Sequence, residues 1–266
     1  MPAKLSGDGL QPAVATRIAN GGRVSFDDRV ASEMPVAFVY NGEPHAVMMA
    51  TPLDLEDFAL GFALTEGVVA DASEFELVDC TRTDAGISLQ AVVPHARFEA
   101  LRTRRRAMEG RAGCGLCGVE TLDAAIRPVP AVAPGNAIPA DAITAGIARL
   151  ATLQPLNAAS GGVHAAAWIE PETLRVREDV GRHNALDKLV GALARAPAGP
   201  GFLLMTSRAS YEIVHKAATA GIAVVAALSA PTDLAIRIAE RAGVTLVAFA
   251  RSESMTIYTN GHRIEP

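Results

Sequence analysis

Two cysteines separated by two residues, Cys114 and Cys117, are the side chains of this sequence best suited to chemistry. They lie within residues 109–118, EGRAGCGLCG, where the density of glycine predicts a mobile loop. A structural zinc site needs four ligands, and neither a second Cys-x-x-Cys pair nor a nearby His pair supplies the missing two. The His-x-Glu sequence that zinc deaminases require before the cysteine pair is also missing. We therefore expect no zinc and no other metal at this pair.

Two thiol chemistries stay open for the pair. A dithiol–disulfide catalyst can use such a spacing, although those motifs usually follow a strand at the start of a helix. Alternatively, a thiolate that accepts a sulfur atom from one partner and presents it to another benefits from the reach of a glycine loop, and the second thiol can assist release. The third cysteine, Cys80, is predicted to be a small buried side chain within a strand.

A second group of candidate residues follows three short apolar segments of the second half of the chain. In open α/β sheets, ligands bind beyond the carboxyl ends of parallel strands, where helix amino termini offer free N–H groups. Ser and Thr are also ordinary helix caps, so the alternative of simple capping stays open. The residues that would form a cradle for a phosphate-bearing or nucleotide ligand are Thr206, Ser207, Arg208, Ser229, Arg251, Ser252, Glu253 and Ser254.

The run of residues 178–188, EDVGRHNALDK, places many hydrogen-bonding side chains around a predicted helix start. We interpret it as a polar wall facing the loop or the ligand, with Arg182 and His183 in it, while capping and a surface histidine are the alternatives. His215 and Trp168 are predicted to pack in the interior.

The elements that position these residues begin with an α+β section. Residues 1–13 lack a hydrophobic period and predict a flexible terminus, with order beginning near Val14. The sequence then predicts a hairpin turning at Asn41-Gly42 and a helix capped by Thr51, with Pro52 at its first position. The expected regular segments are strands 36–40, 45–50, 75–81 and 86–93, and helices from 52 to a stop at Gly67 and over 97–108.

In the second section of the chain, strand-like and helix-like hydrophobic patterns alternate. Residues 127–139 are rich in Pro and Gly and indicate a linker, so we expect a smaller α+β domain over 14–130 and a larger α/β cofactor-binding domain over 131–266. Short apolar strands that alternate with helices over 202–250 imply parallel strands joined by right-handed crossovers. The other expected segments are helices 140–151 and 184–194 and strands 163–170 and 174–177.

Charge and composition exclude several classes of protein. The net charge of −5 disfavours general binding to nucleic acid, and 50% hydrophobic residues supply a full core. The chain has no apolar run long enough to span a bilayer and no signal-like start, so we expect a cytoplasmic protein that is not associated with a membrane.

Together these motifs resemble the FdhD/NarQ family of formate dehydrogenase accessory sulfurtransferases. The order and spacing agree over roughly residues 30–262, and the most specific match is the EDVGRHNALDK run. The other matching segments are CGLCG at 114–118, Thr206-Ser207-Arg208 before Tyr211, Glu212 and Lys216, residues 228–232, and residues 249–251 leading to Tyr258.

The resemblance implies a sulfurtransferase that takes sulfur from a cysteine desulfurase as a persulfide on Cys114, helped by Cys117. The sulfur would pass to the molybdenum cofactor in its bis(molybdopterin guanine dinucleotide) form, which formate dehydrogenase then receives. The implied cofactor-binding residues are the strand-end residues above together with Phe249, Ala250, Arg182 and His183, and a guanine nucleotide such as GDP would mimic the cofactor.

The resemblance also implies a homodimer and a larger domain similar to cytidine deaminase without its zinc. The chain departs from the family pattern at Ser254, where a basic residue is usual. Two other functions stay open: a cofactor carrier without sulfur relay, and a thiol–disulfide oxidoreductase.

Overall fold

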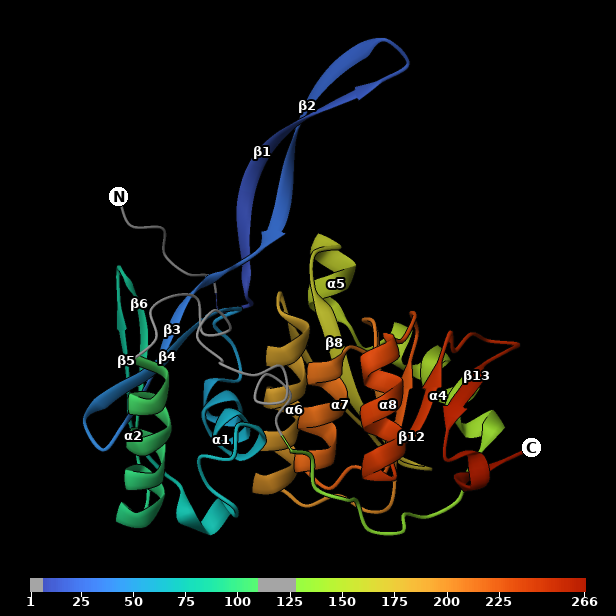
Figure 1. Cartoon of the computed structure of the whole chain (residues 1–266). Coiled ribbons are helices and arrows are strands. Elements are labelled where there is room, and N and C mark those ends of the chain that lie inside the picture. Colours follow the sequence, from blue (N-terminus) through green and yellow to red (C-terminus); the bar gives the residue numbers. More distant parts are fainter. Residues whose placement is uncertain (1–6, 110–127) are drawn as a thin grey trace.

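The computed structural model describes residues 7–109 and 128–266 of the chain (Figure 1). Residues 1–6 and 110–127, which include the cysteine pair, lie outside the described residues. The helices are α1 (Leu55–Thr65), η1 (Ala72–Glu74), α2 (His95–Glu109), α4 (Ala140–Ala151), α5 (Pro155–Ser160), α6 (Arg182–Arg195), α7 (Tyr211–Thr219), α8 (Asp233–Ala242) and η2 (Gly261–Arg263). The strands are β1 (Leu10–Ala19), β2 (Gly22–Ala31), β3 (Met34–Tyr40), β4 (Glu43–Ala50), β5 (Glu76–Thr83), β6 (Gly86–Val92), β7 (Ile138–Pro139), β8 (His164–Ile169), β9 (Leu174–Asp179), β10 (Phe202–Met205), β11 (Val224–Ala227), β12 (Thr245–Ala248), β13 (Thr256–Thr259) and β14 (Ile264–Glu265).

The first section folds around a four-stranded sheet in the order β4-β3-β6-β5. The predicted hairpin is confirmed, because Asn41 and Gly42 have φ values of 50° and 84° between the antiparallel strands β3 and β4. Phe38 and Tyr40 of β3 pack against Phe58 and Phe62 of α1, and the ring centroids of Phe38 and Phe62 are 4.0 Å apart. One face of this sheet therefore forms a core with α1.

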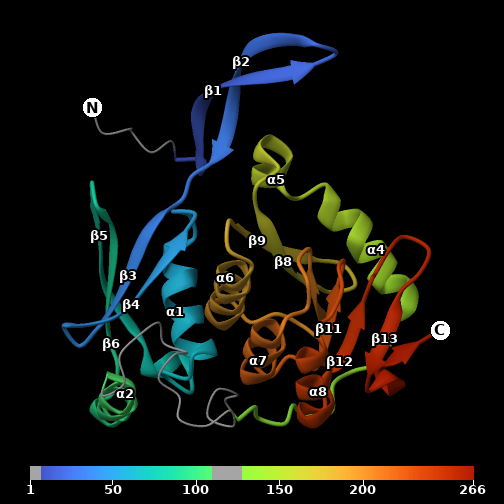
Figure 2. The same ribbon diagram turned by 45° about the horizontal axis from the view of Figure 1, so that its top comes forward.

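The second section folds around a six-stranded mixed sheet in the order β13-β12-β11-β10-β8-β9. Strands β10, β11 and β12 are parallel, as their sequence predicts, whereas β8, β9 and β13 run antiparallel to their neighbours. Helices α6, α7 and α8 pack on one face of the sheet, and α4 packs on the other (Figure 2). The carboxyl ends of the three parallel strands consequently lie at one edge, where the predicted ligand would bind.

Helix α1 joins the two sections by packing against α6 at very close range. A Cβ atom added at Gly61 would lie 1.7 Å from the carbonyl oxygen of Asp187, and one added at Gly191 would lie 1.9 Å from that of Asp57. Two glycines that face the backbone of the opposite helix therefore allow this contact. The proposed division into domains at residue 130 stays a prediction.

Strands β1 and β2 form a long hairpin that projects from the body of the molecule (Figure 1). Our expectation of no order before Val14 is wrong for residues 10–13, because β1 begins at Leu10, which is buried with Leu156 and Val163. The Asn20-Gly21 turn, with φ values of 51° and 77°, was the available signal for this hairpin. Tertiary contact at its base, which the sequence does not show, fixes where it starts.

Three further expectations are corrected by the structure. Helix α1 begins at Leu55 and not at Pro52, because the backbone and hydroxyl of Thr51 bond to residues of the second section. Cys80 is exposed on β5 and not buried. Trp168 is only partly buried, and its Nε1 donates to the carbonyl oxygen of Gly199 at 3.2 Å. His215, as predicted, is buried and packs against Tyr211.

Across residues 7–109 and 128–266, none of the helices combines the length and apolar character that crossing a membrane requires.

Candidate functional site

The loops that follow β10, β11 and β12 are tied together by main-chain hydrogen bonds. The amide of Ala209 donates to Ala230 at 3.1 Å, and the amide of Thr232 donates back to Ala209 at 3.0 Å. The amide of Phe249 donates to the carbonyl oxygen of Ser229 at 3.2 Å. These bonds bring the predicted strand-end residues to a single edge of the sheet: Thr206, Ser207, Arg208, Ser229, Phe249, Ala250, Arg251, Ser252, Glu253 and Ser254.

The turn after β12 holds an aromatic side chain at this edge. Phe249 adopts a left-handed backbone with φ of 49°, which is unusual for a residue other than glycine, and its side chain is 43% exposed. The following turn, residues 251–254, is exposed and closes through a 2.7 Å bond from the amide of Arg251 to the carbonyl oxygen of Ser254. The Nη1 atom of Arg251 also donates to the carbonyl oxygen of Leu228, so this guanidinium lies across the ends of β11 and β12.

Two of the predicted hydroxyls already have partners inside the protein. Thr206 Oγ1 accepts from the amide of Ala165 at 2.8 Å and so joins the end of β10 to β8. Ser207 is buried, and its Oγ donates to the carbonyl oxygen of Arg208 at 3.1 Å. The side chain of Arg208 itself is exposed. At these three positions, the groups left to contact a ligand are the Arg208 guanidinium and backbone amides, since the hydroxyls of Thr206 and Ser207 are already bonded.

The start of β8 and the amino terminus of α6 form a second wall of the same edge. Burial and, to a smaller extent, the charge of Arg182 at the start of α6 lower the pKa of His164, the first residue of β8. His183 Nε2 lies 3.7 Å from Glu212 Oε2 of α7. Among the described residues, Arg182 Nε and His183 Nε2 are both buried without a hydrogen-bond partner. The described residues therefore leave the hydrogen-bonding capacity of both nitrogen atoms unused.

Burial and the charges of Arg182 and Lys216 lower the pKa of His183 to about 4, so the imidazole is neutral at pH 7. An unfolded histidine binds its proton near pH 6.5, so the unfolded state gains protons before the folded state as the pH falls from 6.5 to 4. We expect His183 to lower the free energy of unfolding in that window, by on the order of 1 kcal/mol at pH 5 after allowing for its partial exposure. Urea unfolding at pH 7.5 and pH 5.0 should show this loss for the wild type and a smaller loss for His183→Gln. An identical loss in both proteins would contradict the assignment.

The rest of the EDVGRHNALDK run does not face a ligand, which corrects our interpretation of it as a polar wall. Asp179 and Lys188 are fully buried and form an ion pair of 2.6 Å. Asp179 also accepts from the amide of Thr51 at 3.0 Å and from Asn184 Nδ2 at 2.9 Å, and Lys188 Nζ donates to the carbonyl oxygen of Thr51. The run mainly fastens the first section to α6.

A second buried cluster at the junction includes Asp187, the residue that precedes Lys188 on α6. Lys216 Nζ is 2.9 Å from Asp187 Oδ1 and 2.7 Å from Glu66 Oε1, and Thr65 Oγ1 donates to Asp187 at 2.6 Å. The sequence assigned Thr51 to a helix cap and gave no signal for Thr65 or Glu66, because the partners of all three lie more than a hundred residues away. Only Arg182 and His183 of the run remain at the ligand edge.

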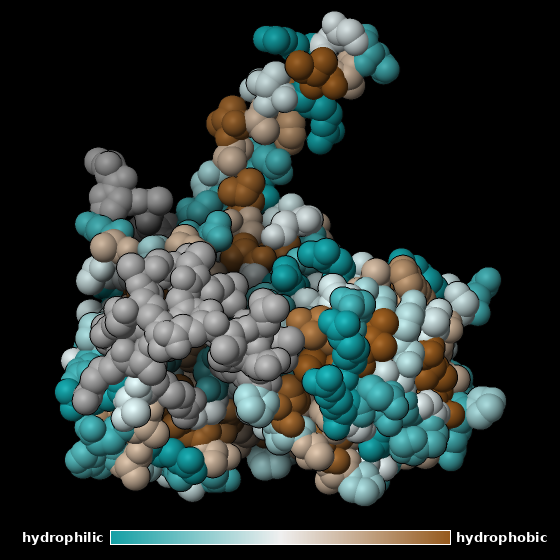
Figure 3. All heavy atoms as spheres, viewed as in Figure 1, coloured by the Kyte–Doolittle hydropathy of each residue, from teal (hydrophilic) through white to brown (hydrophobic). Residues whose placement is uncertain are grey.

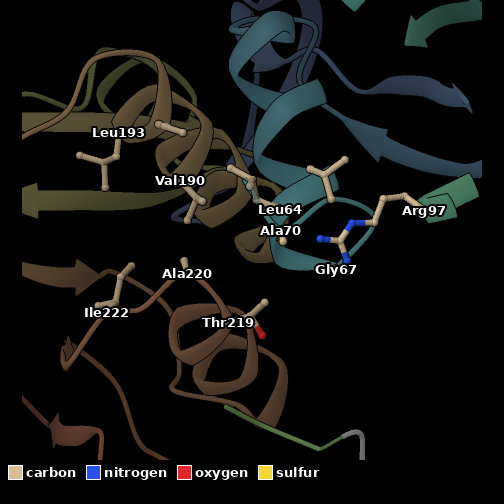
Figure 4. Close-up of a pocket in the computed structure, with 11 residues that line it drawn as sticks. Leu64, Gly67, Ala70, Arg97, Val190, Leu193, Thr219, Ala220 and Ile222 are labelled. Atoms are coloured by element: carbon tan, nitrogen blue, oxygen red, sulfur yellow. The ribbon is translucent and has the colours of Figure 1, made fainter. Parts of the chain in front are cut away.

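A pocket of about 550 Å³ lies between α1, α6 and α7, but at the opposite edge of the sheet (Figure 4). Its wall includes Ile222, which precedes β11, and Val190 and Leu193 of α6. The guanidinium of Arg97 in this wall is already paired with Glu74 at 3.0 Å. The pocket is therefore separate from the strand ends and offers little for an anionic ligand.

The cysteine pair Cys114 and Cys117 lies outside the described residues, and so does the loop around it. Within the parts of the chain that the structure describes, no three or more His, Cys, Asp or Glu side chains are grouped so that they could hold a metal ion. The thiol of Cys80 is exposed, yet partial desolvation raises its pKa above the ordinary value. This thiol is accordingly a poor nucleophile at neutral pH.

Comparison with known proteins decides the family. Residues 31–265 match the FdhD/NarQ family over nearly the whole chain. The chain belongs to the FdhD/NarQ family. It is 51% identical over 250 residues to the sulfur carrier protein FdhD of Xanthomonas euvesicatoria, which covers 92% of this chain and 89% of that protein. It is 48% identical over 258 residues to the FdhD of Bordetella petrii, covering 95% and 93%.

A solved structure supports the same relationship. The crystal structure of a protein described as a formate dehydrogenase accessory protein, from Desulfotalea psychrophila, superimposes with a TM-score of 0.74 at 25% identity. The superposition covers 96% of this chain and 99% of that chain. The family resemblance inferred from the motifs is thereby confirmed. The individual site residues, the cofactor and the persulfide stay predictions.

Proposed function

We propose that this protein carries sulfur for formate dehydrogenase, accepting it from a cysteine desulfurase and transferring it to the molybdenum cofactor. The observation that carries the proposal is the identity of about half of all aligned residues to FdhD proteins named as sulfur carriers, across more than nine tenths of the chain. We further propose that the protein works in the cytoplasm as a homodimer. The six-stranded sheet with its helices would be the cytidine deaminase-like unit that lacks zinc.

The chemistry of the proposed relay needs a nucleophilic thiolate and a helper thiol. The Cys114 thiolate attacks the outer sulfur of the donor persulfide, the donor S–S bond breaks, and the donor leaves as its own thiolate. Cys114 then bears the persulfide. A Cys117 thiolate that attacks the inner sulfur of the Cys114 persulfide would break its S–S bond, release the outer sulfur as hydrosulfide for the cofactor, and leave a Cys114–Cys117 disulfide, which a cellular thiol reduces.

The strand edge suits the guanine dinucleotide portions of the cofactor as a bound substrate. Pyrophosphates are anionic, and Arg182, Arg208 and Arg251 supply positive charge next to the amino termini of α6, α7 and α8. The buried Nε of Arg182 lacks an acceptor among the described residues and so fits a phosphate or carbonyl oxygen. Phe249 offers an exposed aromatic ring against which a base can stack.

We expect GDP to bind at this edge and Arg182→Ala to weaken the binding at least about tenfold, because a charge-assisted hydrogen bond is lost. Isothermal titration calorimetry of the purified protein measures the Kd. Arg241→Ala is the matched control, since Arg241 is an exposed arginine in the last turn of α8, at the far end of that helix. Equal weakening by both variants would mean that the net charge of the protein alone explains the weaker binding, which would contradict a GDP site at Arg182.

Reconstitution tests the proposed function as a whole. Formate dehydrogenase produced in cells that lack their own FdhD should gain activity when it is incubated with this protein, a cysteine desulfurase and L-cysteine. Omitting either L-cysteine or the protein should abolish the gain. Full activation without L-cysteine or a desulfurase would instead favour a carrier of cofactor that relays no sulfur.

A further inference from the structure

The projecting hairpin of β1 and β2 presents two different faces. Antiparallel pairing joins Val14 to Asp27, Thr16 to Ser25 and Ile18 to Arg23, and paired side chains lie on the same face of the hairpin. We name this face, with its six residues, the outer stripe. Val14 and Ile18 are 79% and 67% exposed. On the opposite face the guanidinium of Arg17 covers the ring of Phe26 at 4.6 Å, so that face is partly covered by its own side chains.

Within the described parts of the chain, the exposed apolar side chains of the outer stripe are not covered by the body of the molecule. Leu10 and the 2.8 Å bond from the amide of Ser32 to Gly9 anchor only the base of the hairpin. The rest of it extends away from both sheets, and brown apolar side chains are visible along it (Figure 3). Because an isolated two-stranded hairpin is only marginally stable in water, an extended one of ten residues per strand gains most from a partner.

The residues of the outer stripe are arranged so that the stripe is complementary to itself. Consider a two-fold axis that lies over Thr16 and Ser25, parallel to the sheet surface and perpendicular to the strands. Rotation about it places the outer stripe of a second copy face to face with the first, with the strand directions reversed. Val14 then faces Ile18 of the second copy, and Asp27 faces Arg23 of the second copy. The rotation generates each contact twice, as two-fold symmetry requires. Apolar side chains thus meet apolar ones, and every acid meets a base.

We propose that the outer stripe of the hairpin is a self-association surface, and that its partner is the outer stripe of a second copy of this chain. The six residues of the outer stripe precede residues 31–265, which match the family model. The inference rests on the homodimer of the proposed function and specifies the surface that forms it.

Charge exchange tests this inference in the full-length protein. Sedimentation equilibrium should show a dimer for the wild type and a dimer Kd at least tenfold higher for Asp27→Arg and for Arg23→Asp. Combining both substitutions restores opposite charges across the axis, so the double variant should return to within about threefold of the wild type. The pair Val14→Asp with Ile18→Asp should also weaken the dimer at least tenfold. Val24→Asp is the matched control, because Val24 is 65% exposed on the opposite face of the same hairpin.

Each other outcome contradicts the inference in a distinguishable way. A dimer that all these variants leave intact would show that another surface forms it, while the homodimer itself would stand. A monomeric wild type would overturn both the homodimer and the surface. A double charge variant as weak as the single ones would overturn the register, and loss of binding to formate dehydrogenase with an unchanged dimer would assign the stripe to that partner.

Discussion

Replacing Cys114 by alanine is expected to abolish activation of formate dehydrogenase in the reconstituted system, with a loss of roughly a hundredfold or more. The reason is chemical, since without the thiolate no persulfide can form and the residual activity reflects only cofactor that already carries sulfur. Cys117→Ala should still accept sulfur and should lose a smaller part of the activity, because its proposed role is confined to release. Initial rates of formate oxidation, measured after a fixed reconstitution time, provide the comparison.

Cys80→Ala is the matched control for both variants. Cys80 is exposed on β5 with a raised thiol pKa, so its replacement removes a free thiol without removing a reactive thiolate. Its activity should equal that of the wild type. Equal loss in Cys80→Ala and Cys114→Ala would mean that thiol content, and not the position of Cys114, determines activation.

Gly61→Ala is expected to lower the free energy of unfolding by about 3 kcal/mol, although alanine ordinarily stabilises a helix interior by about 1 kcal/mol relative to glycine. The sign reverses because the new methyl group would lie 1.7 Å from the carbonyl oxygen of Asp187. Helices α1 and α6 would have to separate to admit it, and the buried ion pair of Lys188 and Asp179 close by would be disturbed. Urea unfolding followed by circular dichroism gives the change in midpoint and slope.

Gly162→Ala controls for the loss of glycine as such. Gly162 has no positive φ, and a Cβ atom there would meet no atom closer than 3.9 Å. Its substitution should change the free energy of unfolding by less than about 0.5 kcal/mol. Similar destabilisation by both substitutions would show that the close approach of α1 and α6 does not limit stability.

Local sequence signals predicted much of the fold because the relevant forces act within a few residues. The turn at Asn41-Gly42 needs positive φ at both positions, and only a few residue types tolerate it. The short apolar strands β10, β11 and β12 are buried on both faces, so their composition indicated a parallel sheet. The common edge of the candidate site followed directly from that topology.

Other features depend on contacts between distant parts of the chain. Thr51 and Pro52 together look like a helix start, but Lys188 and Asp179 take the polar groups of Thr51 and α1 begins later. For the same reason most of the EDVGRHNALDK run proved to be a buried junction and not a ligand wall. Cys80 was misplaced because the strand pattern of β5 does not reveal which of its faces is covered.

The most direct test of the account is intact-protein mass spectrometry after incubation with a cysteine desulfurase and L-cysteine, with and without a reductant. The wild type and Cys117→Ala should each gain the mass of one sulfur atom, the reductant should remove it, and Cys114→Ala should gain nothing. Sulfur on Cys114→Ala at the wild-type level would contradict the relay. So would a wild type that gains no sulfur and only loses two hydrogen atoms on oxidation, which would favour a thiol–disulfide oxidoreductase.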